Sequence, residues 1–183
     1  MEALLFYVVD IPLTAELIGR RVGTEGSRAA RGKAGAFMSS VRVFVVEDYA
    51  PFRRFLISKL QTRPELQVID EASDGLEAVH KAEKLKPDLI LLDIGLPSLN
   101  GIEAARRISR VLPDAEILFV SQDNDPDVVA VALSSGAKGY VHKLDVMKDL
   151  LPAVQAVLRG EHFSSAGIRE CLEESLHSDS PSI

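Results

Sequence analysis

From Val41 onward the chain alternates short apolar runs with amphipathic stretches, and this alternation limits its possible folds more than any other feature. Strands of a parallel sheet are buried on both faces and read as continuous apolar runs, whereas the helices that connect them are apolar on one side only. The expected strands are Val41–Val46, Leu66–Ala72, Leu89–Leu92, Ile117–Val120 and Gly139–Val141. The pattern predicts an α/β domain built around a parallel sheet.

The stretches between the apolar runs carry signals of helix starts. The first has a proline suited to an initial turn and apolar residues at positions 52, 55, 56 and 60. Asp74 and Asn100 each stand three residues before a glutamate, which is the spacing of a reciprocal capping box. Asp125 precedes a proline, and Met147–Leu158 carries an apolar stripe with a helical period. We therefore expect one helix after each strand.

Charge and cysteine content narrow the classes of function. The 183 residues include 21 basic and 27 acidic side chains, which give a formal net charge of −6. Because an acidic chain is poorly suited to bind a phosphate backbone, nucleic acid is not the expected partner. Cys171 is the single cysteine, so the chain has no internal disulfide or multi-cysteine zinc site. The early apolar run Ala3–Val9 is too short to span a membrane, and we expect a cytoplasmic protein without membrane contacts.

Three segments differ in composition. Residues 1–38 mix small and basic residues without apolar periodicity, and we expect a flexible N-terminal extension there. Met38 directly precedes Ser-Ser and the first expected strand, which favours a start of translation at Met38, and the extension upstream of it would then not belong to the natural product. Residues 39–160 hold the strand–helix units. Residues 161–183 are expected to form a short helix over 166–176 and a disordered tail.

The most informative polar residues come directly after the expected strands. Glu47 and Asp48 follow the first strand and Asp93 the third, while Ser121 follows the fourth and Lys143 the fifth. Taken singly, each is more simply a turn or cap residue. Open parallel sheets, however, bind ligands outside the carboxyl ends of their strands. We therefore expect these side chains to meet at one edge of the sheet.

The types of these residues point to phosphate chemistry. Three carboxylates in one crevice repel one another and require a cation. The available ligands are hard oxygens without paired histidine or cysteine, so we expect Mg²⁺ as the cofactor and a phosphate-bearing substrate. Lys143 would supply a point charge for phosphoryl oxygens, and Ser121 would supply a hydrogen bond. Asp93 remains as the nucleophile, which would form an acyl phosphate.

The motifs around these residues carry a resemblance to a known family. They are Val-Phe-Val-Val-Glu-Asp at 43–48, Asp-Leu-Ile-Leu-Leu-Asp-Ile-Gly-Leu-Pro at 88–97, Asn-Gly at 100–101 and Gly-Ala-Lys-Gly-Tyr-Val-His-Lys at 136–143. With them, residues 41–160, about two thirds of the chain, resemble the receiver domain of two-component response regulators. The resemblance implies a flavodoxin-like (βα)5 three-layer sandwich whose parallel strands have the order 2-1-3-4-5.

The resemblance also implies a reaction and a metal site. Phosphate would pass from a sensor histidine kinase or a phosphotransfer protein to Asp93, and slow autodephosphorylation would follow. Asp48 and Asp93 would bind Mg²⁺ together with the carbonyl of Gly95, and Glu47 would act through water. The protein would be a phosphorelay switch and not a metabolic enzyme.

By the same resemblance, Ser121 and Lys143 would contact the phosphoryl group, and Tyr140 would be the switch aromatic that turns inward as Ser121 moves toward the phosphate. The switched surface would cover the fourth helix, fifth strand and fifth helix and would bind an output protein of unknown identity or a second copy. Gln122 departs from the family, which has a small residue there, and it leaves the lifetime of the acyl phosphate open. His142 is read as a packing or surface residue, because neighbouring strand residues face opposite sides.

Two rival functions are weighed against this one. Phosphohydrolases of the haloacid dehalogenase type need a second acid two residues after the aspartate, where this chain has Gly95. A DNA-binding regulator is favoured by residues 143–165, which resemble LuxR-type receivers that continue into a helix-turn-helix module. Such a module needs about 60 residues, and 23 follow Gly160. We expect no direct nucleic-acid binding, and the alternative is a transcriptional regulator whose DNA-binding domain is missing or supplied by a partner.

Overall fold

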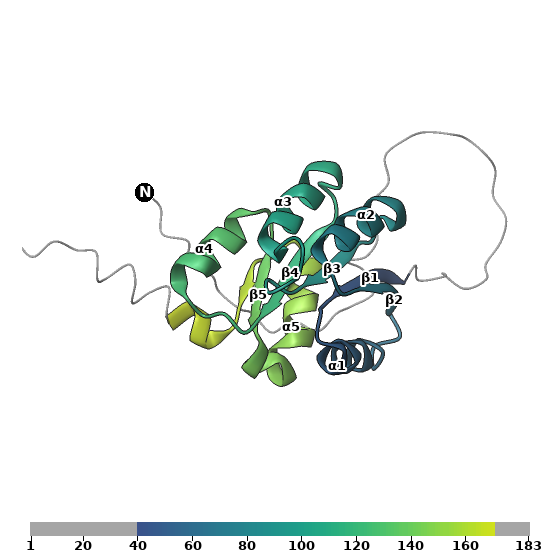
Figure 1. Cartoon of the computed structure of the whole chain (residues 1–183). Helices are drawn as coiled ribbons and strands as arrows, with labels where there is room; N and C mark the ends of the chain where they lie inside the picture. The colour runs from purple at the N-terminus through teal and green to yellow at the C-terminus, as the bar shows by residue number, and fades with distance from the viewer. Residues whose placement is uncertain (1–39, 171–183) are drawn as a thin grey trace, which may run out of the picture.

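The computed structural model describes residues 40–170 (Figure 1). The expectations for residues 1–38, for Cys171 and for the end of the tail lie outside these residues. Within the described part, the strands are β1 (Val41–Val46), β2 (Leu66–Ala72), β3 (Leu89–Leu92), β4 (Glu116–Ser121), β5 (Gly139–His142) and β6 (Phe163–Ser164). The helices are α1 (Ala50–Leu60), α2 (Gly75–Leu85), α3 (Gly101–Val111), α4 (Pro126–Ser134) and α5 (Val146–Leu158), with a 3-10 turn, η2 (Lys143–Asp145), before α5.

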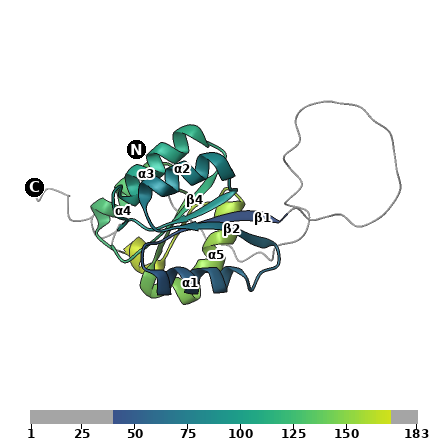
Figure 2. The same ribbon diagram turned by 45° about the vertical axis from the view of Figure 1, so that its right-hand side comes forward.

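The strands form one parallel sheet in the order β2-β1-β3-β4-β5-β6. The expected order 2-1-3-4-5 is confirmed, and β6 extends it by one strand. Helices α2, α3 and α4 cover one face of the sheet and α1 and α5 cover the other, as Figure 2 shows from a second direction. The chain leaves β1 toward β2 on one side and returns to β3 on the other, so the winding direction reverses between β1 and β3.

The core consists of one apolar layer on each face of the sheet. In β1, Phe44 and Val46 face the layer under α2, α3 and α4, whereas Val43 and Val45 face the layer under α1 and α5. The same alternation continues through β3 and β4. Because side chains of both parities are buried, the strands read as unbroken apolar runs, which explains why the sequence located them.

The helix starts use the expected caps. The side chain of Asp74 accepts hydrogen bonds from the first turn of α2, that of Asn100 does so for α3, and that of Asp125 does so for α4. These contacts satisfy backbone donors that have no partner inside the helix. The expected starts of α2, α3 and α4 are therefore confirmed.

The expected return bonds from the glutamates were wrong. Glu77 accepts a hydrogen bond from the backbone N–H of Ser73, and its carboxylate also pairs with Lys81 at 3.0 Å. Glu103 pairs with Arg107 at 3.0 Å. In both helices the carboxylate pairs with a cation four residues along the same face.

Strand β6 is a two-residue element for which the sequence carries no strand pattern. Phe163 donates its backbone N–H to Lys138 at 3.0 Å, and Ser165 donates its own to Tyr140 at 3.1 Å. The hydroxyl of Ser165 accepts a hydrogen bond of 3.2 Å from the backbone N–H of His142 in β5. A helical turn begins at residue 166, and Ile168 is buried in the same apolar cluster as Tyr140. This segment closes the β5 edge of the sheet.

Candidate functional site

The structure brings together the three acidic residues that follow β1 and β3. One carboxylate oxygen from each of Glu47, Asp48 and Asp93 lies within 4.8 Å of the others. Glu47 and Asp93 are only 1% and 5% exposed, whereas Asp48 is open to solvent. Two buried carboxylates side by side repel each other and require a nearby positive charge.

Lys143, directly after β5, supplies that charge. Its ammonium lies 2.8 Å from Oε2 of Glu47 and 2.9 Å from Oδ2 of Asp93. Burial raises the pKa of Glu47 above 4.5, and the Lys143 ammonium beside it offsets only part of this rise. Burial alone would lower the pKa of Lys143, but the two carboxylates beside it outweigh burial and raise the pKa above 10.5. The ammonium therefore stays charged between the two acids.

Asp93 is held by the backbone around it. Its amide donates to the carbonyl of Val46 at 3.0 Å, and its Oδ1 accepts from the amide of Ile94 at 2.8 Å. The start of α3 lies directly against this loop, since a Cβ on Gly101 would come 1.9 Å from the Asp93 carbonyl oxygen. The glycine at position 101 is thus required by the close approach of two backbones.

The acidic residues open into a cavity of about 420 Å³ at the carboxyl ends of the strands. It is lined by Glu47, Asp48, Tyr49, Phe52, Asp93, Ile94, Gly95, Ser121, Gln122, Asp123 and Lys143. The hydroxyl oxygen of Ser121 accepts a hydrogen bond of 3.2 Å from the amide of Asp123, which leaves the hydroxyl hydrogen for another acceptor. A Cβ on Gly95 would lie 3.7 Å from Oδ2 of Asp93, so the loop that carries Gly95 passes close to that carboxylate.

Tyr140 lies in the core behind the loop that follows β4. Its side chain is fully buried, and its hydroxyl donates a hydrogen bond of 2.8 Å to the carbonyl of Asp123. Its ring centroid lies 6.2 Å from that of Phe119. Burial raises the pKa of Tyr140 from 10.0 to about 12. The structure thus places Tyr140 inward, with its hydroxyl attached to the same residue whose amide contacts Ser121.

Several contacts at the site were missed from the sequence. Phe52 was assigned to the apolar face of the first helix, yet its ring lies 4.9 Å from the Lys143 ammonium and lines the cavity. Arg53 donates a hydrogen bond of 2.6 Å to the carbonyl of Glu47. The sequence offers one indication of these contacts, which is position: both residues stand in the first turn of the helix that follows Glu47 and Asp48. His142 lies with its Nε2 3.1 Å from the carbonyl of Gln122, as a surface residue would.

The donor set fits a hard divalent cation. Three carboxylates and the nearby Gly95 loop offer oxygen ligands of the kind that Mg²⁺ prefers. Oε2 of Glu47 is buried and makes no hydrogen bond of good geometry, although the Lys143 ammonium approaches it. This acidic cluster is typical of the Mg²⁺ site of a receiver domain.

The family follows from comparison with known proteins. The sequence model of the response regulator receiver domain matches residues 43–155. The chain belongs to this family. The receiver is 36% identical over 121 residues to the transcriptional regulatory protein LiaR of Bacillus subtilis, a match that covers 66% of the chain and 57% of LiaR. It is 34% identical over 122 residues to DegU of Brevibacillus brevis, which covers 67% of the chain and 52% of DegU.

Solved structures agree with this assignment. A LuxR-family response regulator from Aurantimonas sp. SI85-9A1 aligns with a TM-score of 0.73 and 30% identity, over 76% of the receiver chain and 99% of that structure. The response regulator domain of Thermotoga maritima CheB aligns with a TM-score of 0.61 and 33% identity, over 65% and 96% of the two chains. The protein is a two-component signalling receiver and not a metabolic enzyme.

The chain spans between 52% and 58% of the length of the curated relatives it matches, so their full activities are not transferred to it. Among residues 40–170, no helix is both long and apolar enough to cross a bilayer.

Proposed function

We propose that the receiver takes a phosphoryl group from a sensor histidine kinase or a phosphotransfer protein onto Asp93. The observation that carries this proposal is the pairing of the buried Asp93 carboxylate with the Lys143 ammonium at 2.9 Å, at the wall of an open cavity. The carboxylate is the nucleophile, and the ammonium binds phosphoryl oxygens as the new anion forms. Such a relay takes place in the cytoplasm, where kinases have access to ATP.

Asp48, Asp93 and the Gly95 carbonyl would hold Mg²⁺, and Glu47 would contact the ion through water. When bound, Mg²⁺ neutralises phosphoryl oxygens so that an anionic donor can approach the carboxylates. The buried position of Glu47 supports this role, because its negative charge is only partly balanced by Lys143.

The transfer step balances without a further reactant. A carboxylate oxygen of Asp93 forms the new O–P bond while the N–P bond of the donor phosphohistidine breaks. The imidazole nitrogen leaves with the electron pair of that bond and takes up a proton from solvent water. Lys143 and the hydroxyl of Ser121 bind the phosphoryl oxygens. Water later hydrolyses the acyl phosphate slowly, at a rate that depends on how far Gln122 restricts access to the cavity.

The output is a change of the surface formed by α4, β5 and α5. Ser121 and Tyr140 both contact Asp123, one through its amide and the other through its carbonyl. A turn of the Ser121 hydroxyl toward a phosphoryl group therefore loosens one side of the loop and biases the packing of Tyr140. A shift between two packings of similar free energy needs only a few new contacts. The changed surface would bind an output protein or a second receiver.

The direct test is phosphorylation by acetyl phosphate with Mg²⁺, followed by intact-mass measurement. The wild type should gain one phosphoryl group, and Asp93→Asn should gain none. Asp123→Asn is the matched control, since it removes another carboxylate from the same cavity, and it should still be phosphorylated. Labelling that persists in Asp93→Asn would refute the proposal.

A second candidate output is transcriptional regulation through a DNA-binding domain that lies outside the receiver or on a partner protein. It is favoured by the names of LiaR and DegU, both transcriptional regulatory proteins. We further propose that residues 39–160 are the receiver, that residues 161–183 form the outgoing segment, and that residues 1–38 lie outside the natural product. Intact mass of the native protein tests these bounds. A mobility-shift assay with the phosphorylated chain tests DNA binding, and we expect none.

A further inference from the structure

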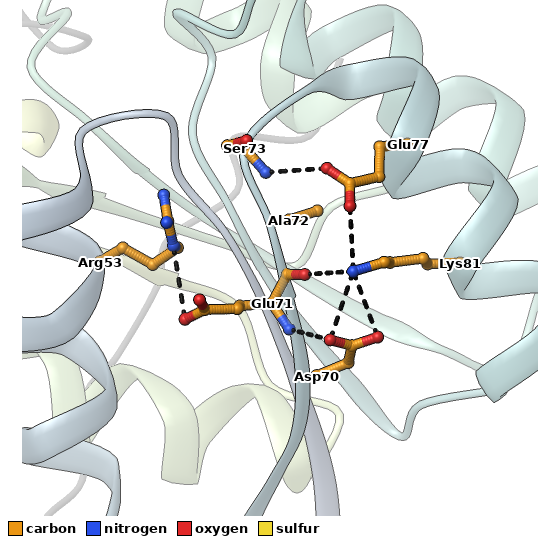
Figure 3. A pocket seen from close by; sticks show the side chains of 7 residues that line it. All are labelled: Arg53, Asp70, Glu71, Ala72, Ser73, Glu77 and Lys81. Carbon is orange, nitrogen blue, oxygen red and sulfur yellow. Dashed lines mark hydrogen bonds and ion pairs between the residues drawn. The ribbon is translucent and has the colours of Figure 1, made fainter.

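A second charged hollow lies beside the acidic site, between α1, β2 and α2 (Figure 3). Its volume is about 300 Å³, and it is lined by Arg53, Asp70, Glu71, Ala72, Ser73, Glu77 and Lys81. Arg53 is the member that connects it to the acidic site. Its side chain comes from the first turn of α1 and is 15% exposed.

Arg53 contacts the backbone of both acidic residues that follow β1. One guanidinium nitrogen donates a hydrogen bond of 2.6 Å to the carbonyl of Glu47 and makes a longer contact of 3.4 Å to the carbonyl of Asp48. The carboxylates of these two residues belong to the proposed metal site, while their backbone carbonyls accept from the Arg53 guanidinium. Groups that hold ligand residues in this way have large effects on metal affinity in other sites.

The rest of the hollow orients Arg53. Its Nε lies 3.4 Å from Oε2 of Glu71. Lys81 donates to the carbonyl of Glu71 at 2.7 Å and pairs with the carboxylates of Asp70 and Glu77 at 3.3 and 3.0 Å. Figure 3 shows Glu71 between Arg53 and Lys81. Lys81 pairs with the carboxylates of Asp70 and Glu77 but contacts Glu71 only at its backbone carbonyl. The carboxylate of Glu71 faces the guanidinium instead.

We propose that Arg53 is a positioning residue for the metal site, an inference that rests on the proposed Mg²⁺ binding. Its guanidinium fixes the carbonyls of Glu47 and Asp48 and so places their carboxylates for the cation. The charge of Arg53 acts in the opposite direction, since a cation near the site repels a second cation. Positioning predicts weaker metal binding when Arg53 is removed, whereas charge alone predicts stronger binding.

The test is a titration of the full chain with Mn²⁺, a substitute for Mg²⁺ whose free and bound forms are distinguished by electron paramagnetic resonance. Arg53→Met should weaken binding about 10-fold. Arg54→Met is the matched control, because Arg54 is the exposed next residue of α1 and the change in charge is the same. It should leave affinity unchanged or slightly raise it. Arg53→Lys should bind more tightly than Arg53→Met, because an ammonium can still donate to one carbonyl.

A second pair of variants keeps the test decisive if Arg53→Met fails to fold. Glu71→Gln releases the guanidinium from its anchor without touching the acidic loop, and Glu77→Gln makes the same charge change within the hollow at a residue that contacts Lys81. Weaker Mn²⁺ binding in Glu71→Gln than in Glu77→Gln supports positioning.

Equal affinity in Arg53→Met and Arg54→Met, or in the two glutamine variants where Arg53→Met does not fold, overturns the role of Arg53. Failure of the underlying metal site looks different. In that case the wild type itself would bind no Mn²⁺, or Asp48→Asn and Asp93→Asn would bind it as well as the wild type.

Discussion

The ammonium of Lys143 donates a hydrogen bond of 2.9 Å to Oδ2 of Asp93, and the same ammonium lies 2.8 Å from Oε2 of Glu47. One ammonium thus faces two buried carboxylates and balances part of their negative charge. A divalent cation bound by the carboxylates would replace Lys143 as their positive partner, and the ammonium could then bind phosphoryl oxygens. The pairing therefore links metal binding to the availability of the lysine.

Replacement of Lys143 by methionine separates the two roles. Without metal, the unfolding free energy should fall by about 1–3 kcal/mol, because Glu47 and Asp93 stay buried without a nearby positive charge. Mg²⁺ should restore part of this loss and should bind at least as tightly as to the wild type, since a competing cation is gone. Urea denaturation with and without Mg²⁺ measures both effects. Loss of Mg²⁺ affinity in this variant would mean that the lysine itself helps to build the metal site.

The buried hydroxyl of Tyr140 should be visible in an alkaline titration. The raised pKa of about 12 means that the folded state keeps the phenol protonated above its ordinary pKa of 10.0. Its contribution to stability is complete below pH 10 and is lost as the pH rises toward 12. The difference between the tyrosinate absorbance of the wild type and that of Tyr140→Phe should show a midpoint near pH 12. A midpoint near pH 10 would show that the ring is not held inward.

Tyr140→Phe also removes the hydrogen bond to the Asp123 carbonyl, which should lower the unfolding free energy by about 1 kcal/mol at neutral pH. Thermal or urea unfolding measures this change. A variant as stable as the wild type would mean that the hydroxyl contributes no net hydrogen bond in the folded state.

The sequence predicts a strand of this fold only where the strand has an apolar pattern of its own. Strand β3 has the predicted bounds because its four apolar residues are buried on both faces. Strand β4 extends one residue beyond the prediction at each end, because Glu116 pairs with Leu89 of β3 and Ser121 pairs with His142 of β5. Strand β6 was missed because two residues have no periodicity. It depends on pairing with β5, which is a long-range contact.

Some contacts of the candidate site follow from the topology of the sheet, and others depend on local conformation that the sequence does not show. The meeting of Glu47, Asp93 and Lys143 could be predicted because parallel topology brings strand ends to one edge. The contacts of Arg53 could not be predicted, because an arginine in an amphipathic helix is usually solvated. Sequence spacing also does not tell which carbonyl its guanidinium reaches. The present partner of Ser121, the amide of Asp123, depends on the conformation of one short loop.

Gly101 offers a test of how tightly the Asp93 loop is held. A Cβ at this position would come 1.9 Å from the carbonyl oxygen of Asp93, so Gly101→Ala must displace one of the two backbones. We expect a loss of about 1–3 kcal/mol in unfolding free energy and slower phosphorylation of Asp93. Gly167→Ala is the control, because a Cβ there meets nothing within 4 Å, and it should be neutral or stabilising. Equal stability of the two variants would contradict the close approach.

The segment that closes the β5 edge should respond to phosphorylation at a distance from Asp93. Ser165 donates its amide to the carbonyl of Tyr140, and Ile168 shares the buried cluster with the Tyr140 ring, so an inward ring stabilises this segment. A phosphoryl mimic that biases the packing of Tyr140 should therefore reach this segment: beryllofluoride with Mg²⁺ should change amide hydrogen exchange over residues 163–168 several-fold, while α2 at the other end of the sheet stays unchanged. Hydrogen-exchange mass spectrometry measures both regions. No change over 163–168, or the same change in Asp93→Asn, would separate this segment from the switch.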